Sequence, residues 1–244
     1  MKMLAALFAL LLLPAAGHAQ DVDHSAFDAL LKANVKGSSV KYSGFQNNDS
    51  FKAYLKTIQE TDPKALPSRN ARLAFWINAY NALTINSVLQ HMPGIKSVQD
   101  PYPEFGFFKR KDHTIGGKKL SLNDIENNII RPRFKDARIH AALNCASVSC
   151  PPLAPFAFTA KKLNGQLQRQ MKKFINDKSR NAIGAEVKLS QIFNWYGDDF
   201  KAAGGVAAYM AKFLDADQAK AVADAEAAGK VQFLEYNWGL NAAR

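Results

Sequence analysis

The stretch Arg138-Ile139-His140-Ala141-Ala142-Leu143-Asn144-Cys145-Ala146-Ser147-Val148-Ser149-Cys150-Pro151-Pro152 contains both cysteines of the chain and one of its five histidines. Residues 138–143 alternate in a way that predicts a short strand, with His140 and Ile139 on opposite faces. The small residues that follow predict a loop. Any thiol chemistry of the protein must take place here, because the segment holds both cysteines. We expect the fold to be organised around it.

The first residues have the pattern of a secretory signal peptide. A basic start at Lys2 precedes an apolar run from Met3 to Leu13, and small residues end at Ala19, before Gln20. We expect residues 1–19 to be removed on export to the periplasm or the exterior, leaving residues 20–244 as a single globular domain. The apolar run is shorter than the roughly 20 residues of a membrane-spanning helix, so no membrane span is predicted.

The composition is that of an ordinary globular protein, with 48% hydrophobic and 22% charged residues. The net charge is +11, and residues 100–180 hold 16 Lys and Arg against 7 Asp and Glu, a local balance of +9. Such a field attracts acidic partners, although solvated surface charge alone would produce the same count. Export argues against nucleic acid as the partner.

The periodicity along the chain predicts an α+β fold. Helical spacing of apolar residues, or turn signals at the ends, predicts helices at residues 21–36, 51–62, 68–92, 121–131, 161–174 and 215–229. Alternating patterns predict strands at 40–43, 113–115, 118–120, 187–189 and 231–238, the second and third joined by a Gly116-Gly117 turn. We therefore expect helices packed around a small, mainly antiparallel sheet, for which a papain-like arrangement is one analogy. His113, on a strand edge, is predicted to be solvated.

Two asparagines lie one turn apart on the strongest helix, which Ser68 is predicted to cap. Asn78 and Asn81 lie beside its apolar face, so their amide groups need partners. They can clamp a neighbouring loop or contact a substrate, and clamping is the commoner use of a buried amide.

The helix at 121–131 begins with a capping pattern, Ser121 followed by Asp124, and is predicted to end at Pro132. Glu126 and Arg131 lie along it. Glu126 is predicted either to be an exposed helical charge or to be the carboxylate that orients His140.

Four blocks of sequence, taken in order, resemble the family catalogued as domain of unknown function 547. They are Phe75 to Leu83, Leu120 to Arg131, Arg138 to Leu153, and Ile192 to Phe200. The resemblance covers roughly residues 45–201. It implies that Asn78, Asn81, Glu126, His140, Cys145 and Cys150 occupy motif positions, but it implies no secure reaction. In the family a histidine often follows the glutamate, and this chain has Asn127 there, so His140 must act alone or the activity is altered.

The leading hypothesis is a cysteine-dependent enzyme that performs acyl transfer or hydrolysis on a peptide or amide. Cys145 or Cys150 attacks, His140 shuttles the proton, and Glu126 or Asn78 orients the imidazole. The five-residue separation puts His140 and Cys145 on opposite faces of a strand, so the chain must bend near Asn144. Pro151 restricts the backbone of the rival Cys150.

Three alternatives stay open. In the first, Cys145 and Cys150 form a disulfide in a non-catalytic module whose basic surface binds an acidic partner. The second is redox exchange, which the four-residue spacing disfavours relative to a CXXC motif. The third is metal binding, which is weaker because one histidine and two cysteines lack an evident fourth ligand. No cofactor is implied.

Overall fold

The strongest helical pattern forms the central helix of the molecule, α3 (Arg69–His91). Ser68 caps it as predicted, because its side chain accepts a hydrogen bond from the Ala71 N–H at 3.0 Å. Every residue from Leu73 to Ile85 is buried. A helix that is buried all round must be covered on all sides, so the rest of the chain wraps α3.

The computed structural model describes residues 20–202 and 204–243. The predicted signal peptide, residues 1–19, lies outside the described residues and stays a prediction. The helices other than α3 are α1 (Ser25–Asn34), α2 (Asp49–Glu60), α4 (Gly106–Lys109), α5 (Arg131–Phe134), α6 (Leu163–Ile175), α7 (Gln191–Trp195), α8 (Gly197–Lys201), α9 (Val206–Met210) and α10 (Ala216–Ala227). Two 3₁₀ helices, η1 (Tyr42–Gly44) and η3 (Ala137–Ala141), and a π-helix, η2 (Asp124–Ile130), complete the helical set.

The strands form three small sheets. Antiparallel pairs are made by β1 (Val35–Lys36) with β2 (Ser39–Val40), and by β3 (His113–Ile115) with β4 (Lys118–Leu120). The third sheet joins β5 (Ala182–Ile183) antiparallel to β6 (Val187–Leu189), which runs parallel to β7 (Gln232–Phe233). The α+β class with small, mainly antiparallel sheets is confirmed.

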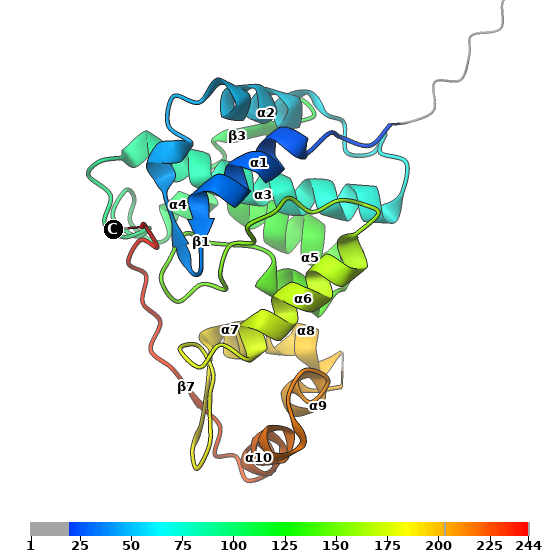
Figure 1. Cartoon of the computed structure of the whole chain (residues 1–244), viewed down its shortest axis with the longest axis vertical. Coiled ribbons are helices and arrows are strands. Elements are labelled where there is room, and N and C mark those ends of the chain that lie inside the picture. Colours follow the sequence, from blue (N-terminus) through cyan, green and yellow to red (C-terminus); the bar gives the residue numbers. More distant parts are fainter. Residues whose placement is uncertain (1–19, 203, 244) are drawn as a thin grey trace, which may run out of the picture.

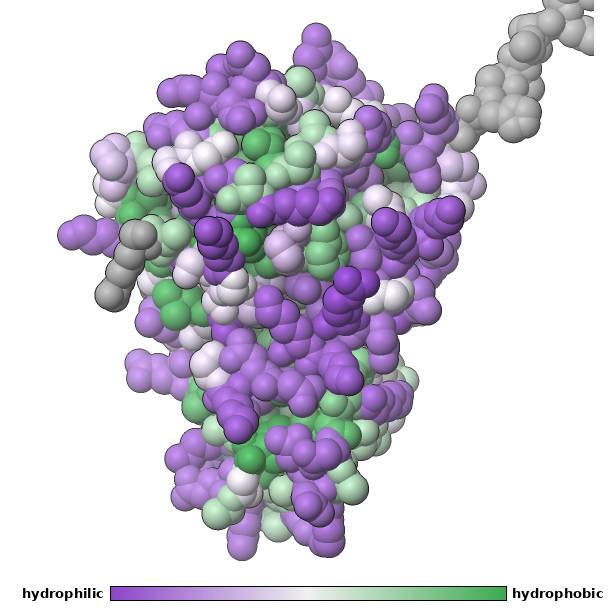
Figure 2. All heavy atoms as spheres, viewed as in Figure 1, coloured by the Kyte–Doolittle hydropathy of each residue, from purple (hydrophilic) through white to green (hydrophobic). Residues whose placement is uncertain are grey.

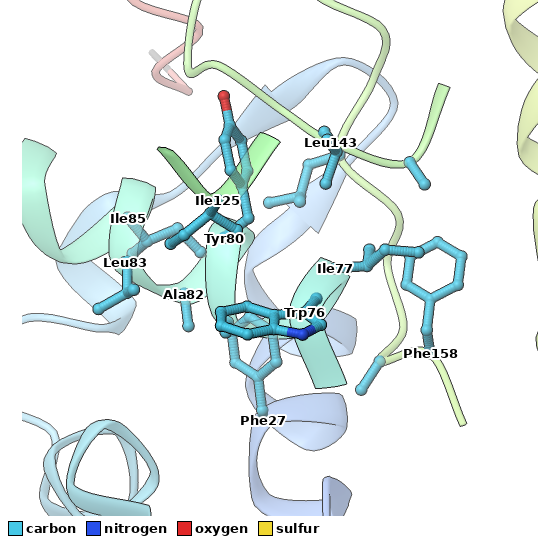
Figure 3. Packing of buried hydrophobic residues seen from close by; sticks show 14 of the residues in the cluster. Phe27, Trp76, Ile77, Tyr80, Ala82, Leu83, Ile85, Ile125, Leu143 and Phe158 are labelled. Carbon is cyan, nitrogen blue, oxygen red and sulfur yellow. The ribbon is translucent and has the colours of Figure 1, made fainter. Parts of the chain in front are cut away.

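Two hydrophobic clusters divide the interior. The larger surrounds α3, and Figure 3 shows Ile77 and Tyr80 of this helix among Phe27, Leu143 and Phe158. The smaller is built from α6 to α10, which form the lower part of Figure 1. The 3₁₀ helix η3 contributes to both, with Ile139 in the larger cluster and Ala141 in the smaller. The segment that carries His140 therefore lies at the junction of the two.

Several predicted elements differ in the structure. Where a strand was predicted at 138–143, the 3₁₀ helix η3 runs to Ala141 and a turn follows, so the argument that His140 and Cys145 lie on opposite strand faces is wrong. The closing strand predicted at 231–238 pairs only at β7. Of the strand predicted at 40–43 only Val40 lies in a strand, β2, and η1 begins at Tyr42. Pro132 does not end a helix. It lies at the second residue of α5, which follows η2 directly.

The capping pattern at Ser121 and the Gly116-Gly117 hairpin are confirmed. The Asp124 N–H donates to Ser121 Oγ at 2.9 Å, and the Ser121 N–H donates to an Asp124 carboxylate oxygen at 3.0 Å. His113 is buried, however, not solvated, because strand β3 packs against α2.

The face drawn in Figure 2 is covered mostly by hydrophilic side chains, with hydrophobic groups in separate patches. Within the described residues, no helix is both long and apolar enough to cross a membrane.

The Asn78 side chain clamps the backbone of Phe158. Its Nδ2 donates to the Phe158 carbonyl at 2.8 Å, and its Oδ1 accepts from the Phe158 N–H at 2.9 Å. Both partners are buried, so this amide replaces the hydrogen bonds that a strand neighbour would otherwise supply.

We expect Asn78→Ala to lower the free energy of unfolding by about 2–4 kcal/mol, because it leaves a buried N–H and a buried C=O without partners. Urea denaturation measures the change. Asn128→Ala, which removes an exposed amide from η2, is the matched control and should change the free energy by less than about 0.5 kcal/mol. Equal effects of the two substitutions would contradict the clamp.

Candidate active site

A buried loop that lacks regular structure carries the two cysteines. Residues 142–159 contain no helix or strand, yet many of them are buried. Asn81 of α3 holds its first part, since Nδ2 donates to the Ala142 carbonyl at 2.9 Å and Oδ1 accepts from the Asn144 N–H at 2.9 Å. The predicted clamping role of the two helix asparagines is therefore what their contacts show.

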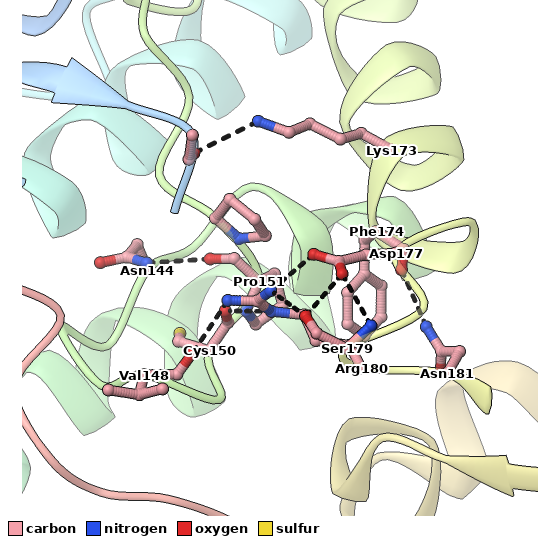
Figure 4. A network of polar contacts seen from close by, with 12 residues as sticks. Asn144, Val148, Cys150, Pro151, Lys173, Phe174, Asp177, Ser179, Arg180 and Asn181 are labelled. Atoms are coloured by element: carbon pink, nitrogen blue, oxygen red, sulfur yellow. Dashed lines mark hydrogen bonds and ion pairs between the residues drawn. The ribbon is translucent and has the colours of Figure 1, made fainter. Parts of the chain in front are cut away.

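Arg180 holds the same loop from the other side (Figure 4). Its Nε donates to the Cys150 carbonyl and its Nη2 to the Val148 carbonyl, both at 2.8 Å. The Asp177 carboxylate pairs with Nη1 at 2.5 Å and balances the charge. Because the Arg180 side chain is almost fully buried, its guanidinium is a fixed support for the loop.

The C-terminal segment completes the enclosure. The Val148 N–H donates to the Gly239 carbonyl at 2.8 Å, and the Asn241 N–H donates to the Ala146 carbonyl at 3.0 Å. Ala146, directly after Cys145, has a positive φ of 63°. An alanine adopts this left-handed conformation only at a cost, so the surrounding hydrogen bonds hold the loop in a strained form.

The two sulfurs are free thiols in different settings. Cys145 is half-buried, and its Sγ lies 3.0 Å from Ser147 Oγ and 3.2 Å from the Tyr236 hydroxyl. Cys150 is buried, and its Sγ accepts a hydrogen bond from the Cys145 N–H at 2.8 Å. Cys145 is thus the more accessible of the pair.

The same contacts set the two thiol pKa values apart. Burial raises the pKa of Cys145, but hydrogen bonds from Cys150, Ser147 and Tyr236 outweigh it and lower the value to about 7. Burial and the neighbouring Cys145 raise the pKa of Cys150 well above its usual value. When the pair loses a proton near neutral pH, the negative charge therefore lies on Cys145, which makes Cys145 the better nucleophile.

His140 is oriented by an aspartate far along the chain. Its Nε2 lies 2.7 Å from Oδ2 of Asp199 on α8, and its ring stacks on Tyr196 with centroids 4.0 Å apart. Asp199 also accepts two hydrogen bonds from Arg131, at 2.7 and 3.1 Å. Hydrogen bonds from His140, and then from Arg131, hold the Asp199 pKa well below its usual range despite the opposing effect of burial.

This pairing assigns the imidazole tautomer. An ionised carboxylate only accepts hydrogen bonds, so His140 Nε2 carries the ring proton and donates a hydrogen bond to Asp199. In the neutral ring, Nδ1 is then the acceptor. This atom is buried, and it has no hydrogen-bond partner among the described residues. A buried acceptor without a partner is available for a thiol or a substrate proton.

Asn127, which stands where the family that the sequence resembles often has a histidine, is connected to His140 through Arg131 and Asp199. Asn127 Oδ1 accepts from Arg131 Nη1 at 2.8 Å, and Asn127 Nδ2 donates to Asn123 at 3.0 Å. Arg131 donates a hydrogen bond to Asp199, and Asp199 is in turn hydrogen-bonded to His140. Asn127 therefore positions the arginine rather than carrying a proton itself, because an amide does not titrate.

The site surrounds a cavity of about 220 Å³. It lies between the two hydrophobic clusters and is lined mainly by aromatic side chains, together with both thiols, His140 and Glu126. The lining residues are Tyr80, Phe105, Phe108, Lys109, Asn123, Glu126, Asn127, His140, Leu143, Cys145, Cys150, Ile192, Trp195, Tyr196, Tyr236 and Trp238.

The structure brings four of the predicted catalytic residues together, since Cys145, Cys150, His140 and Glu126 all line this cavity. The carboxylate on His140 is Asp199, however, and not Glu126. Asn78 and Asn81 do not line the cavity. Arg131 does not line it either, but is paired with Asp199. No hydrogen bond between His140 and Cys145 is formed in the described part of the chain.

Sequence reasoning missed Asp199, Arg180 and Tyr236 as site residues. Asp199 belongs to the aromatic block from Ile192 to Phe200, and its position three residues after Tyr196 was the available signal. Arg180 and Tyr236 carry no local pattern that separates them from other arginines and tyrosines.

Residues 63–175 match a family model described as "Protein of unknown function, DUF547". The match confirms the resemblance seen in the sequence and spans α3, the cysteine loop and α6. Neither the search of curated proteins nor the search of solved structures found a match. Asp199 and Tyr236 lie beyond the matched segment.

We expect the alkylation rate of Cys145 by iodoacetamide to rise with pH through a midpoint near its pKa of about 7, because the thiolate is the nucleophile. Peptide mapping by mass spectrometry measures the rate. Tyr236→Phe removes a donor to the sulfur and should move the midpoint upward. Tyr209→Phe removes a buried hydroxyl that has no partner and should leave it in place. A wild-type midpoint above 8.5, the value of an ordinary thiol, would refute the assignment.

The low pKa of Asp199 makes the His140–Asp199–Arg131 cluster sensitive to acid. A carboxylate whose pKa is lowered on folding contributes stability above its unfolded pKa of about 4 and loses it as the pH falls further. The difference in unfolding free energy between wild type and Asp199→Asn should therefore be greatest near neutral pH and shrink below about pH 4. Asp198→Asn, at an exposed neighbour, should show little difference at any pH. A pH-independent difference for Asp199→Asn would contradict the ion pairing.

Proposed function

We propose that this protein is an exported cysteine-dependent enzyme that performs acyl transfer or hydrolysis on a peptide or amide. One observation carries the proposal. The half-buried thiol of Cys145, whose pKa is about 7, shares a cavity with a histidine that has one nitrogen on a carboxylate and the other without a partner. These are the three parts that a thiol nucleophile requires.

The proposed roles follow from the contacts. The Cys145 thiolate attacks the carbonyl carbon and forms a thioester as the amine leaves. His140 Nδ1 takes the thiol proton and returns it to the leaving nitrogen, while Asp199 fixes the ring and stabilises its charged form. Water or a second amine then gives a proton to His140 Nδ1 and attacks the thioester, which releases Cys145 as a thiolate. Arg131 acts indirectly, by positioning Asp199.

The hydrogen bond between His140 and Cys145 forms in this proposal only when the substrate binds. In free enzymes catalytic hydrogen bonds are often long and tighten when the substrate binds. Cys145 meanwhile has donors of its own in Ser147 and Tyr236, which stabilise the thiolate before any contact with His140. The family-typical histidine at position 127 is therefore not needed to generate the nucleophile.

The competing hypothesis of a non-catalytic module has less support. It relied on a Cys145–Cys150 disulfide, whereas the structure has two free thiols. It also relied on a basic surface, but four of the arginines in residues 100–180 are paired with acidic residues, Arg110 with Asp112, Arg131 with Asp199, Arg138 with Asp136 and Arg180 with Asp177.

Incubation of the purified protein with a mixed library of peptides and simple amides tests the proposed activity. We expect mass spectrometry to detect new carboxylic acid or transamidated products with wild type and none with Cys145→Ser. His140→Ala should lower the rate by about 10²–10⁴-fold, the usual contribution of a general base.

The control is His113→Gln, which changes a buried histidine outside the cavity and should retain the rate. Products that persist with Cys145→Ser would assign the reaction to another group. A wild type without any product in the library would count against the proposed reaction.

A further inference from the structure

Glu126 is an acidic side chain in a largely aromatic cavity. It lies on the π-helix η2, is half-buried, and lines the same space as Cys145 and His140. π-Helical turns are rare and are frequently found at functional sites. The sequence left Glu126 as either an exposed charge or the carboxylate that orients His140, and Asp199 is the carboxylate that contacts His140.

The carboxylate faces aromatic rings from two other elements. Burial raises the pKa of Tyr80 and of Tyr196, and in each case the negative charge of Glu126 is the next cause. Tyr80 comes from α3, while Tyr196 lies between α7 and α8. Glu126 therefore lies near both phenol rings, at the part of the cavity where His140 stacks on Tyr196.

No basic side chain in the described part of the chain forms an ion pair with Glu126. Arg131, the nearest arginine on the following helix, is bound to Asp199, which also pairs with His140. Lys109 also lines the cavity, but it is exposed, so water and salt screen its charge more than that of a half-buried carboxylate. The charge of Glu126 acts on Arg131 only as the last of the causes that raise the Arg131 pKa, after the contact with Asp199. A half-buried carboxylate without a direct ion pair is therefore stabilised by a cationic ligand.

The remaining rings form an aromatic wall at the mouth. Trp195 stacks on Trp238 with centroids 5.5 Å apart, and Tyr236 packs against both, at 4.7 and 4.4 Å. Trp195 is 45% exposed and Phe105, which packs on Trp238, is 39% exposed, so large apolar surface is left open to a ligand. Aromatic faces attract cations through their quadrupoles, tryptophan most strongly.

We propose that this cavity recognises a protonated amine or guanidinium on the substrate, with Glu126 as the counter-charge and the surrounding rings as the cage. The inference rests on the proposed function, because it places the cation near the amide that Cys145 attacks. The substrate class is thus a peptide or amide that carries a basic group beside the scissile bond. The volume, about 220 Å³, accommodates one side chain of this kind rather than a long segment.

Fluorescence titration with three small probes tests the charge preference. Trp195 and Trp238 line the cavity, whereas Trp76 is buried in the larger cluster, so ligand binding should alter the emission of the first two. The probes are benzylammonium, neutral benzyl alcohol and anionic phenylacetate. We expect benzylammonium to bind at least ten-fold more tightly than either of the others.

The Glu126→Gln substitution should remove that preference by weakening benzylammonium binding ten-fold or more while leaving benzyl alcohol unchanged. The matched control is Glu235→Gln, which removes the same charge from an exposed position next to Tyr236 but outside the cavity lining, and which should keep the preference. Equal binding of the three probes by wild type, no binding at all, or a preference that survives Glu126→Gln would overturn the proposal.

Titration of Cys145→Ser separates this inference from the proposed function. Recognition of the cation does not require the thiol, so benzylammonium should bind the variant as it binds wild type. A protein that binds the ammonium probe through Glu126 but turns over no amide would retain the recognition site and lose the catalytic assignment. Turnover of amides without any charge preference would retain the catalytic assignment and overturn the recognition site.

Discussion

The burial of an irregular loop is the constraint on which this structure depends. Residues 142–159 pass through the interior without helix or strand, so their backbone N–H and C=O groups need partners from elsewhere. Side-chain amides and one guanidinium supply many of them, from Asn78, Asn81, Gln166, Gln170 and Arg180. Each of these polar groups is itself buried, so none has water as an alternative partner. The loop and its supports therefore form one unit.

This constraint explains the placement of the thiols. A loop held on several sides keeps Cys145 beside Ser147 and Tyr236 even though Ala146 adopts a left-handed conformation. Fixed donors lower the pKa of a thiol more effectively than mobile ones, because no reorganisation is needed when the thiolate forms. The site joins both hydrophobic clusters, with η3 bringing His140 from one side and α8 bringing Asp199 from the other.

The parts of the fold that were predictable from the sequence are those whose signals are local. Helix α3, its Ser68 cap, the Ser121–Asp124 capping box and the β3–β4 hairpin follow from spacing and turn residues alone. The amides of Asn78 and Asn81 were expected to clamp a loop because a buried amide must be satisfied. Asp199 was missed because its partner His140 is 59 positions away, and a pairing at that distance leaves no periodic trace. The error at 138–143 has a physical cause as well, since three alternating apolar residues fit a 3₁₀ turn between two clusters as readily as a strand.

Brief treatment of the native protein with a neutral alkylating reagent, followed by peptide mapping without prior reduction, tests the central claim most directly. The account predicts that Cys145 is modified first, while Cys150 reacts only after the protein unfolds, because one sulfur is half-buried with a lowered pKa and the other is buried with a raised pKa. Recovery of the two cysteines in a single disulfide-linked peptide, or modification of Cys150 before Cys145, would contradict it.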